Sequence, residues 1–466
     1  MTQILLGQSY YLRFDPKLWE AMQPYPPLGT LYAASYLRQH GYDVALFDAM
    51  LAESEEEWAI ALDEHKPQYA IIYEDNFNYL SKMCLLRMRE AAFKMVEMAK
   101  SRGCVVILCG ADATDHYVEY LDKGADYCLL GEGEETLIEL LGQLSAGKEA
   151  GQVIGLVSRS TVHPSRRPDI TNLDKLPFPA WDLVDIEKYR SIWMKRHGYF
   201  SMNMVTTRGC PYHCNWCAKP IWGQRYNSRS PENVVAEMKW LKENFAPDHI
   251  WFADDILGLK PNWIEKFAVL LNETKVAIPF KCLQRADLVN EKTAAALAKA
   301  GCKTVWIGAE SGSQKILDAM EKGDQVEDIY RAAQLLRENG IKVGFFLQFG
   351  YPGEMWEDVQ MTLKMVRECA PDDIGISVSY PLPGTKFFER VKLELGEKQN
   401  WVDSEDLAML FRGPFPTEFY RILHGRVHYE FRAWKALRQP SLRRLVNIPR
   451  NLAGLVRSEM QLRKFI

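Results

Sequence analysis

Short apolar runs alternate with amphipathic segments along the first 150 residues. Five runs have the length and composition of buried strands: residues 4–6, 43–47, 69–73, 105–109 and 127–130. Five intervening segments carry apolar residues at helical spacing: 28–39, 54–63, 84–101, 114–122 and 134–144. Strands that alternate with helices usually form a parallel sheet covered on both faces. The pattern predicts an α/β domain over residues 1–150, built on a doubly wound parallel sheet.

A second alternating series begins near residue 199. Its six predicted strands are residues 202–205, 249–252, 279–283, 304–307, 343–347 and 374–378. This series predicts a partial (β/α)6 barrel over residues 199–386, with the active site at the carboxyl ends of the strands. Residues 151–198 form a linker in which Pro164, Pro168, Pro177 and Pro179 are expected to break any long element. Residues 387–466 are expected to form a C-terminal helical extension.

The overall composition is that of a soluble globular protein. Of 466 residues, 47% are hydrophobic and 25% are charged, and the net charge of -4 gives no general reason to expect a nucleic-acid partner. No run approaches ~18 uninterrupted apolar residues, so no membrane-spanning helix is expected. The Met1-Thr2-Gln3-Ile4 start lacks a basic segment followed by a long apolar run, and ten cysteines in so long a chain make no disulfide scaffold. We therefore expect a cytoplasmic protein.

Three cysteines dominate the candidate chemistry. Cys210, Cys214 and Cys217 follow Arg208-Gly209 with the spacing C-x3-C-x2-C, which places three thiolates within eight residues. This spacing suits an iron-sulfur cluster whose fourth iron has no protein ligand and is open to a small molecule. A structural zinc site would need a fourth ligand. His213 lies between two of the cysteines, where the short chain makes simultaneous coordination difficult, and disulfides are not favoured here.

With Trp216 directly before the last cysteine, this motif resembles the signature loop of radical S-adenosylmethionine (SAM) enzymes. The resemblance implies that Cys210, Cys214 and Cys217 hold a 4Fe-4S cluster and that SAM chelates its open iron. It also implies that Trp216 lies against the adenine of SAM. One electron from the cluster would then cleave SAM to methionine and a 5'-deoxyadenosyl radical. Such an anaerobic enzyme would take its electrons from a donor such as flavodoxin or ferredoxin.

Polar residues follow several predicted barrel strands, and the resemblance implies SAM contacts there. The candidate SAM-binding residues are Trp216, Asp254, Asp255, Gln284, Arg285, Glu310, Ser311, Gln348 and Gly350. The two aspartates suit the SAM ammonium, but helix capping explains either one equally well. Arg285 suits the SAM carboxylate or ribose, with an ordinary salt bridge at the rim as its alternative.

Two loops in the first domain follow predicted strands, where doubly wound sheets bind ligands. They are Gly110-Ala111-Asp112-Ala113-Thr114 and Gly131-Glu132-Gly133-Glu134. Alone, such loops are turns and helix starts. Together with 26–29 and 124–127, upstream of the cysteine motif, they resemble the cobalamin-binding domain of cobalamin-dependent radical SAM enzymes. The D-x-H-x-x-G motif does not occur in this segment, so the resemblance implies cobalamin bound without a histidine below it.

The last 33 residues are strongly basic. Residues 434–466 carry eight Lys or Arg against one acid, Glu459, among leucines, valines and isoleucines. A basic amphipathic helix in contact with a membrane surface is one interpretation. The other is a solvated helical tail packed on the barrel, because Pro440 and Pro449 interrupt any long helix.

These features predict a cobalamin-dependent radical SAM enzyme acting on a small molecule. We favour methylation of an unactivated carbon through methylcobalamin. The alternative is a radical oxidative cyclase or rearrangement enzyme that uses cobalamin without methyl transfer, because 215–220 and 252–255 resemble the magnesium-protoporphyrin monomethyl ester cyclase branch. A cluster- and cobalamin-based sensor also remains open, and SAM turnover distinguishes it. The remaining cysteines are expected to be core thiols: Cys84, Cys104, Cys109, Cys128, Cys282, Cys302 and Cys369.

Overall fold

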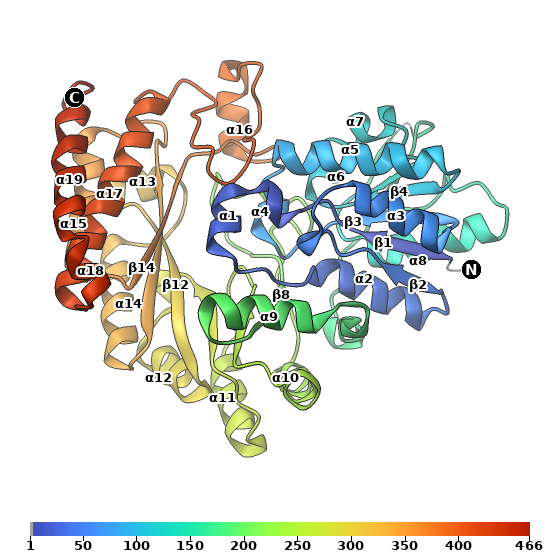
Figure 1. The fold of residues 1–466 in the computed structure, drawn as a ribbon, viewed down its shortest axis with the longest axis horizontal. Helices are drawn as coiled ribbons and strands as arrows, with labels where there is room; N and C mark the ends of the chain where they lie inside the picture. The colour runs from blue at the N-terminus through green and yellow to red at the C-terminus, as the bar shows by residue number, and fades with distance from the viewer. Residues whose placement is uncertain (1–2, 162) are drawn as a thin grey trace. The chain divides into compact units, whose positions relative to one another are not determined.

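A computed structural model describes residues 3–161 and 163–466 (Figure 1). The interpretation of the chain's start at Met1 and Thr2 lies outside the described residues. The first sheet has the strand order β2-β1-β3-β4-β5-β6. Its strands are β1 (Ile4–Gly7), β2 (Val44–Leu46), β3 (Tyr69–Tyr73), β4 (Val105–Cys109), β5 (Tyr127–Leu129) and β6 (Leu156–Val157). The first five are parallel, and β6 pairs antiparallel with β5.

Helices cover both faces of this sheet. Successive strand residues point to opposite sides, so each face presents apolar side chains that a helix can bury. On one face Leu5 and Ile72 share an apolar core with Trp58 of α3 (Glu56–His65) and with α5 (Leu86–Ser101). On the other, Ile4 and Ile71 pack with α2 (Leu28–Gln39) and α8 (Glu134–Ser145). The predicted doubly wound sheet is confirmed. The helix expected at 114–122 is split into α6 (Ala111–Asp115) and α7 (Tyr117–Asp122).

The second sheet has the order β14-β13-β12-β11-β10-β7. Its strands are β7 (Ser201–Met204), β10 (His249–Phe252), β11 (Phe280–Gln284), β12 (Cys302–Glu310), β13 (Lys342–Phe349) and β14 (Asp373–Val378). Strands β7, β10 and β11 pair in parallel, as do β12, β13 and β14. The helices that accompany this sheet are α10 (Pro231–Phe245), α11 (Trp263–Thr274), α12 (Glu291–Ala300), α13 (Gln314–Ala319), α14 (Val326–Glu338) and α15 (Trp356–Cys369). The predicted six-strand partial barrel is confirmed.

The expectation that the linker holds no long element was wrong. Helix α9 (Ile186–His197) runs for 12 residues within it. The four linker prolines all precede residue 181, so none interrupts this helix. Asp185 caps its amino end by accepting from the Lys188 amide, and Gly198, at φ 77°, ends it in the left-handed conformation. The short edge strand β6 was also not predicted.

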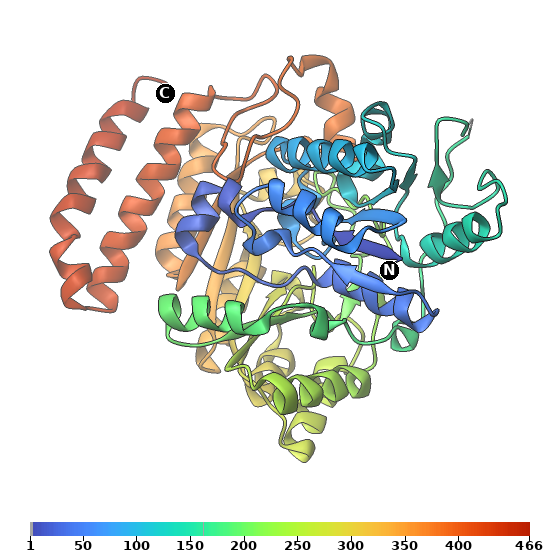
Figure 2. The same cartoon turned by 45° about the vertical axis from the view of Figure 1, so that its right-hand side comes forward.

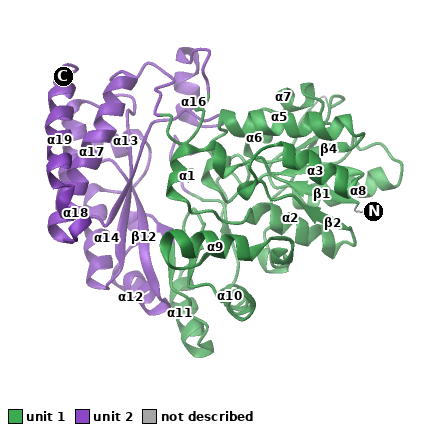
Figure 3. Ribbon diagram, in the orientation of Figure 1, with its two compact units in different colours: residues 1–211, 218–281, 400–406 green, residues 212–217, 282–399, 407–466 purple. Residues whose placement is uncertain are grey.

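The described chain divides into two compact units (Figure 3). Unit 1 comprises Met1–Pro211, Ala218–Lys281 and Asn400–Asp406, and unit 2 comprises Tyr212–Cys217, Cys282–Gln399 and Leu407–Ile466. Unit 1 also contains α1 (Pro16–Ala21), α4 (Tyr79–Lys82), β8 (Thr207–Arg208) and β9 (Asn227–Ser228). Unit 2 also contains α16 (Lys386–Val391), α17 (Thr417–Arg438), α18 (Leu442–Val446) and α19 (Ile448–Leu462).

The expected C-terminal helices are present, and α17 and α19 lie side by side (Figures 1 and 2). Pro440 follows the end of α17, and Pro449 lies in the first turn of α19, where proline is tolerated. Neither proline therefore prevents these two helices from forming. Within 3–161 and 163–466, no helix combines the length and apolar content needed to cross a bilayer.

Candidate functional site

The cysteine motif lies in the loop that follows β8 (Thr207–Arg208). Cys210, Cys214 and Cys217 are all half-buried. Gly209 turns the chain into the loop at φ 81°, and a Cβ atom there would lie 2.4 Å from the Arg225 carbonyl oxygen. Only glycine combines this conformation with so close an approach. The loop therefore presents three thiols that remain accessible to a cluster.

The other seven cysteines are buried, as predicted. Burial raises the pKa of Cys109 well above its usual value and raises the pKa values of Cys128 and Cys369 to about 12. Neutral thiols are poor metal ligands and nucleophiles. The structure thus separates three accessible thiols from a set of core thiols.

Asn215 fixes the cysteine loop within unit 2. Its backbone N–H donates to the Met320 carbonyl at 3.0 Å, and its side-chain amide donates to the Ala319 carbonyl at 2.8 Å. Its side-chain oxygen accepts from the Tyr351 hydroxyl at 2.8 Å, and its carbonyl accepts from the Phe387 N–H at 3.0 Å. These four bonds hold the segment between Cys214 and Cys217 in place.

Arg285 lies beside the cysteine loop. Its guanidinium contacts the Cys214 Sγ at 3.8 Å and the Tyr212 ring at 3.8 Å from the centroid. Asp287 accepts from its Nε at 3.0 Å, and the Lys322 carbonyl accepts from its Nη2 at 2.9 Å. The salt-bridge alternative is therefore present, and the same guanidinium lies against Cys214.

Trp216 offers an unused donor next to the last cysteine. Its ring packs against a cluster of buried side chains that includes Met320, Tyr351 and Phe387. Its indole N–H is buried and has no hydrogen-bond partner among the described residues. Buried donors are normally paired. A ligand acceptor at this position would satisfy the donor, which fits the predicted role of Trp216 beside SAM.

The end of β12 is strained at Glu310. This residue adopts φ 52°, which is uncommon for a residue other than glycine. Burial raises the pKa of Glu310 to about 7, and the opposing charge of Lys322 limits the rise. The neighbouring Ser311 is already hydrogen-bonded to Thr362 at 3.2 Å. Of this predicted pair, Glu310 is the better placed to accept from a ligand hydroxyl or amine.

Two more predicted SAM residues, Gln348 and Gly350, lie at the end of β13. Gln348 donates to the Ser379 hydroxyl at 3.1 Å. Gly350, at φ 80°, donates its backbone N–H to the Glu354 carboxylate at 2.7 Å. Glu354 is fully buried, and its second oxygen has no partner among the described residues. Burial raises the pKa of Glu354 to about 8, so the carboxyl group is mostly protonated at neutral pH.

Replacing Glu354 by Gln should change the pH dependence of stability. The folded protein keeps the proton up to about pH 8, whereas the unfolded chain loses it near pH 4.5. The unfolded state binds fewer protons across this window, so the contribution of Glu354 to stability falls as the pH rises. We expect Glu354→Gln to be more stable than the wild type by about 1–3 kcal/mol at pH ~7.5 and by less at pH ~5.5. Urea denaturation of both proteins checks this, and a difference that does not vary with pH would contradict it.

The two predicted ammonium ligands on unit 1 already have partners. Asp254 accepts from the Thr206 and Thr207 backbone N–H groups, each at 2.7 Å, and from both threonine hydroxyls. Asp255 pairs with Lys82 at 2.9 Å. The next helix, α11, begins only at Trp263, so Asp254 is not its cap. Asp254 instead holds the segment that enters the cysteine loop, and its SAM contact stays a prediction.

The two predicted cobalamin loops are joined to each other. The Thr114 hydroxyl donates to the Gly110 carbonyl at 2.8 Å and accepts from the Gly131 N–H at 3.1 Å. A Cβ atom on Gly110 would lie 2.7 Å from Glu74, so glycine permits this close approach. Asp112 is paired with Arg89, which donates two hydrogen bonds to its carboxylate at 2.6 and 2.8 Å. The structure thus brings the two loops together at one edge of the first sheet.

The same edge contains buried polar atoms without partners. Gln8 follows β1 (Ile4–Gly7) and Asn76 lies shortly after β3 (Tyr69–Tyr73), and both are at least 97% buried. The Gln8 side-chain nitrogen and the Asn76 side-chain oxygen have no hydrogen-bond partner among the described residues. A ligand with amide groups would satisfy both, since each can pair with an amide. Cobalamin carries such groups around its ring, so the residues present at this edge fit it.

Glu132 and Glu134 bind the segment that leads to Cys210. Arg208, only 3% exposed, is ion-paired to Glu132 and lies 2.7 Å from the Glu134 carboxylate. Glu132 also accepts from the Trp222 indole at 3.1 Å and from the Ile170 N–H. Although burial opposes ionisation, the two carboxylates hold the pKa of Arg208 above its usual value. Unit 1 therefore connects a predicted cobalamin loop to the residue two positions before Cys210.

One other set of side chains has the spacing of metal ligands within the described part of the chain: Cys84, Asp112 and His116. Arg89 donates to Asp112 and lies 3.0 Å from the His116 Nδ1. The Arg89 guanidinium thus already supplies, beside these three side chains, the positive charge that a metal ion would bring. We assign no metal to it.

Comparisons with known proteins agree with this geometry. Residues 204–366 match the model of the Radical SAM superfamily. An uncharacterised methyltransferase of Pyrococcus horikoshii is 28% identical over 375 residues, which is 78% of this chain and 78% of that protein. The anaerobic magnesium-protoporphyrin IX monomethyl ester cyclase of Rubrivivax gelatinosus is 26% identical over 393 residues, which is 82% of this chain and 68% of that protein.

A solved structure shares the fold. The radical S-adenosylmethionine methyltransferase TsrM from Kitasatospora setae, with cobalamin and a 4Fe-4S cluster bound, superposes with a TM-score of 0.68. Its sequence identity is 20%, and the match covers 84% of this chain and 74% of that chain. Residues 204–366 therefore carry a radical SAM domain, and the fold of the chain is that of the TsrM structure.

Proposed function

We propose that this chain is a cobalamin-dependent radical SAM enzyme that methylates an unactivated carbon of a small molecule. The observation that carries the proposal is the set of ion pairs that Arg208 makes with Glu132 and Glu134. These contacts tie a loop at the ligand-binding edge of the first sheet to the entrance of the cysteine loop. Such a connection is useful where two cofactors must act in one reaction. The methyltransferases among the relatives support the same activity.

The proposed roles follow from the contacts of each residue. Cys210, Cys214 and Cys217 would hold the cluster, and Arg285 would lie beside it through its contact with Cys214. Trp216 would lie against the adenine and donate its free N–H to it. When bound, the cluster supplies the electron that cleaves SAM, and cobalamin supplies the methyl group. The electrons would come from a small donor such as flavodoxin or ferredoxin.

The cysteines are reduced, which agrees with an enzyme that works under reducing conditions. No pair of the ten cysteines forms a disulfide. A protein with accessible thiolates and an oxygen-sensitive cluster is best kept in a reducing compartment. A cytoplasmic location is therefore part of the proposal.

Labelled SAM tests the proposed reaction. With SAM carrying deuterium in its methyl group, we expect labelled product, with 5'-deoxyadenosine and S-adenosylhomocysteine in comparable amounts. The reason is that each turnover uses one SAM for the radical and a second for the methyl group. Mass spectrometry of the anaerobic reaction measures all three products.

The relative that is a cyclase supports oxidative cyclisation as the second candidate. The same reaction distinguishes it, because a cyclase would form 5'-deoxyadenosine without S-adenosylhomocysteine and without label in the product. Substrate candidates are the small molecules that enzymes encoded by neighbouring genes would make or consume. Absence of 5'-deoxyadenosine above background with every candidate would instead favour a sensor.

A further inference from the structure

Helix α19 (Ile448–Leu462) shows apolar side chains to solvent and packs polar ones inward. Its buried residues are Asn451, Ser458 and Leu462. On the opposite face Leu452, Val456 and Met460 are 49%, 59% and 68% exposed. Their spacing of four residues places them in one stripe along the helix. This is the reverse of the usual arrangement, in which an amphipathic helix buries its apolar stripe.

The inner contacts of α19 are specific. A Cβ atom on Gly454 would lie 2.8 Å from the Tyr429 ring of α17 (Thr417–Arg438), so the two helices approach closely there. Arg426 of α17 donates to Glu459 of α19 at 2.8 Å and to Glu430 at 2.8 Å. The side of α19 that faces α17 is therefore already packed. The exposed stripe is a different side of the same helix.

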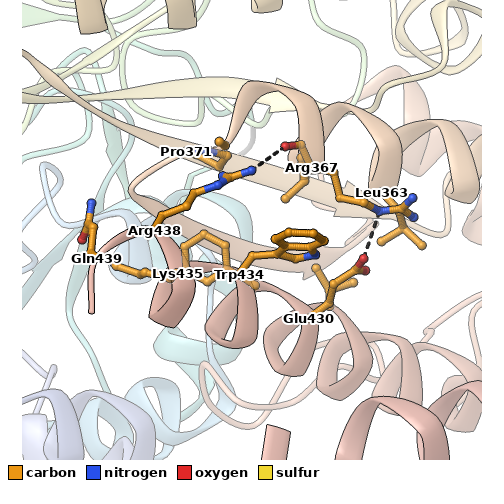
Figure 4. Close-up of a pocket in the computed structure, with 12 residues that line it drawn as sticks. Leu363, Arg367, Pro371, Glu430, Trp434, Lys435, Arg438 and Gln439 are labelled. Carbon is orange, nitrogen blue, oxygen red and sulfur yellow. Dashed lines mark hydrogen bonds and ion pairs between the residues drawn. The ribbon is translucent and has the colours of Figure 1, made fainter. Parts of the chain in front are cut away.

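Helix α17 is itself anchored to α15 (Trp356–Cys369). Figure 4 shows Glu430 paired with Arg367 at 2.9 Å and Arg438 donating to the Arg367 carbonyl at 3.1 Å, with Trp434 between them. The cavity that these side chains line holds about 40 Å³, enough for water but not for a substrate. The inner side of the helical pair is thus occupied, and the stripe on α19 is its uncovered side.

The charge around the stripe has one sign. Glu459 is the single acid among residues 434–466, and it is turned toward Arg426. Arg450, Arg457 and Lys464 are exposed and form no ion pair with the residues that the structure describes. At helical spacing these three basic residues follow one edge of the stripe. We call Leu452, Val456, Met460, Arg450, Arg457 and Lys464 the basic apolar face.

We propose that the basic apolar face binds the surface of an anionic phospholipid bilayer. An exposed apolar stripe edged by Lys and Arg is the arrangement of helices that lie in a membrane interface. Anionic headgroups attract the cations, and the acyl boundary takes up the apolar side chains. The neighbouring α18 (Leu442–Val446) adds exposed Leu442 and Val446 beside Arg443.

A second copy of this chain fits the face less well. In a symmetric dimer the same patch meets itself, which would place the cations of both copies together. Like charges brought together at an interface oppose association. Nucleic acid would pair with the cations but would leave Leu452, Val456 and Met460 in water. An anionic bilayer is the partner that satisfies both the charge and the apolar stripe.

Vesicle binding tests the proposal with the full chain, without any cofactor. We expect co-sedimentation with vesicles of phosphatidylcholine containing about 30% phosphatidylglycerol, and at least about tenfold weaker binding to pure phosphatidylcholine. Raising the salt from about 0.1 M to about 0.5 M should weaken binding by screening the cations. The readout does not depend on SAM turnover, so its failure is distinct from failure of the proposed enzyme activity.

Two variants separate the contribution of the apolar stripe to membrane binding from that of the cations. Leu452→Ser/Val456→Ser/Met460→Ser removes the stripe, and Arg450→Gln/Arg457→Gln/Lys464→Gln removes the cations. Each should weaken binding to the anionic vesicles by about tenfold while the circular dichroism spectrum stays unchanged, because these side chains are exposed. Ile60→Ser/Val269→Ser, at exposed apolar positions of unit 1, should bind as the wild type does.

Three results would overturn the proposal. The first is equal wild-type binding to neutral and anionic vesicles, or no binding to either. The second is unchanged binding by both face variants. The third is a wild-type dimer in light scattering that becomes a monomer in the Leu452→Ser/Val456→Ser/Met460→Ser variant, which would assign the face to a second copy.

Discussion

Cys214→Ala should hold almost no iron after anaerobic reconstitution and should not cleave SAM. The wild type should hold about four iron and four sulfide per chain, because three thiolates and SAM complete the coordination of one 4Fe-4S cluster. Two thiolates hold such a cluster poorly. Cys214 is the most informative of the three because Arg285 lies 3.8 Å from its sulfur, so its loss also removes this contact. Iron, sulfide and 5'-deoxyadenosine are the quantities to measure.

Cys369→Ala is the matched control. Cys369 lies in α15, is 3% exposed, and has a thiol pKa raised to about 12 by burial. Its loss should cost stability through a small cavity and leave the iron content unchanged. If the single alanine variants at Cys210, Cys214 and Cys217 all kept wild-type iron, the cluster assignment would be wrong.

Arg208→Gln should destabilise the protein by roughly 3–5 kcal/mol, because it leaves two buried carboxylates without their cation. Glu132 and Glu134 are at most 6% exposed, so water cannot replace the guanidinium. The strand that enters the cysteine loop would lose its anchor as well. We therefore expect lower iron content and weaker cobalamin retention in the fraction that folds. Urea denaturation and metal analysis measure the two effects.

Arg225→Gln provides the comparison at an exposed arginine of the same unit. The Arg225 side chain is 62% exposed and lies 3.6 Å from Asp169, so its loss should cost at most about 1 kcal/mol. Adding Glu132→Gln and Glu134→Gln to Arg208→Gln should recover part of the lost stability, because no buried charge is then left unpaired. Equal effects of Arg208→Gln and Arg225→Gln would argue against the proposed role of Arg208.

The helices and strands followed closely from the hydrophobic pattern. Helix α2 has the predicted bounds, Leu28–Gln39, because its apolar periodicity is preceded by prolines and followed by Gly41 at φ 85°. Each of the eleven strands predicted across the two sheets is present, since buried parallel strands are continuous apolar runs. The hydrophobic pattern did not predict helix α9, because the proline-rich sequence before it is typical of irregular structure. It also failed at β6, which is only two residues long.

The residues of the site were easier to predict than the side chains and backbone groups with which they form ion pairs and hydrogen bonds. The cysteine spacing is local, so the sequence sufficed to place all three in one loop. Arg208 and Glu132 are separated by 76 positions, and their pairing depends on how the first sheet and the cysteine loop fold together in unit 1. The same applies to Asp254, whose threonine partners lie on another segment. The contacts of Asn215 could not be predicted, because three of its four partners are backbone groups and the fourth, the Tyr351 hydroxyl, is 136 positions away.

We propose above all that one chain holds both an iron-sulfur cluster and cobalamin. The most direct test is metal analysis of the protein purified without oxygen in the presence of hydroxocobalamin, combined with its absorption spectrum. We predict about four iron and about one cobalt per chain, with a spectrum that lacks histidine ligation to cobalt. A folded protein that retains zinc in place of iron, or no cobalt, would contradict the claim.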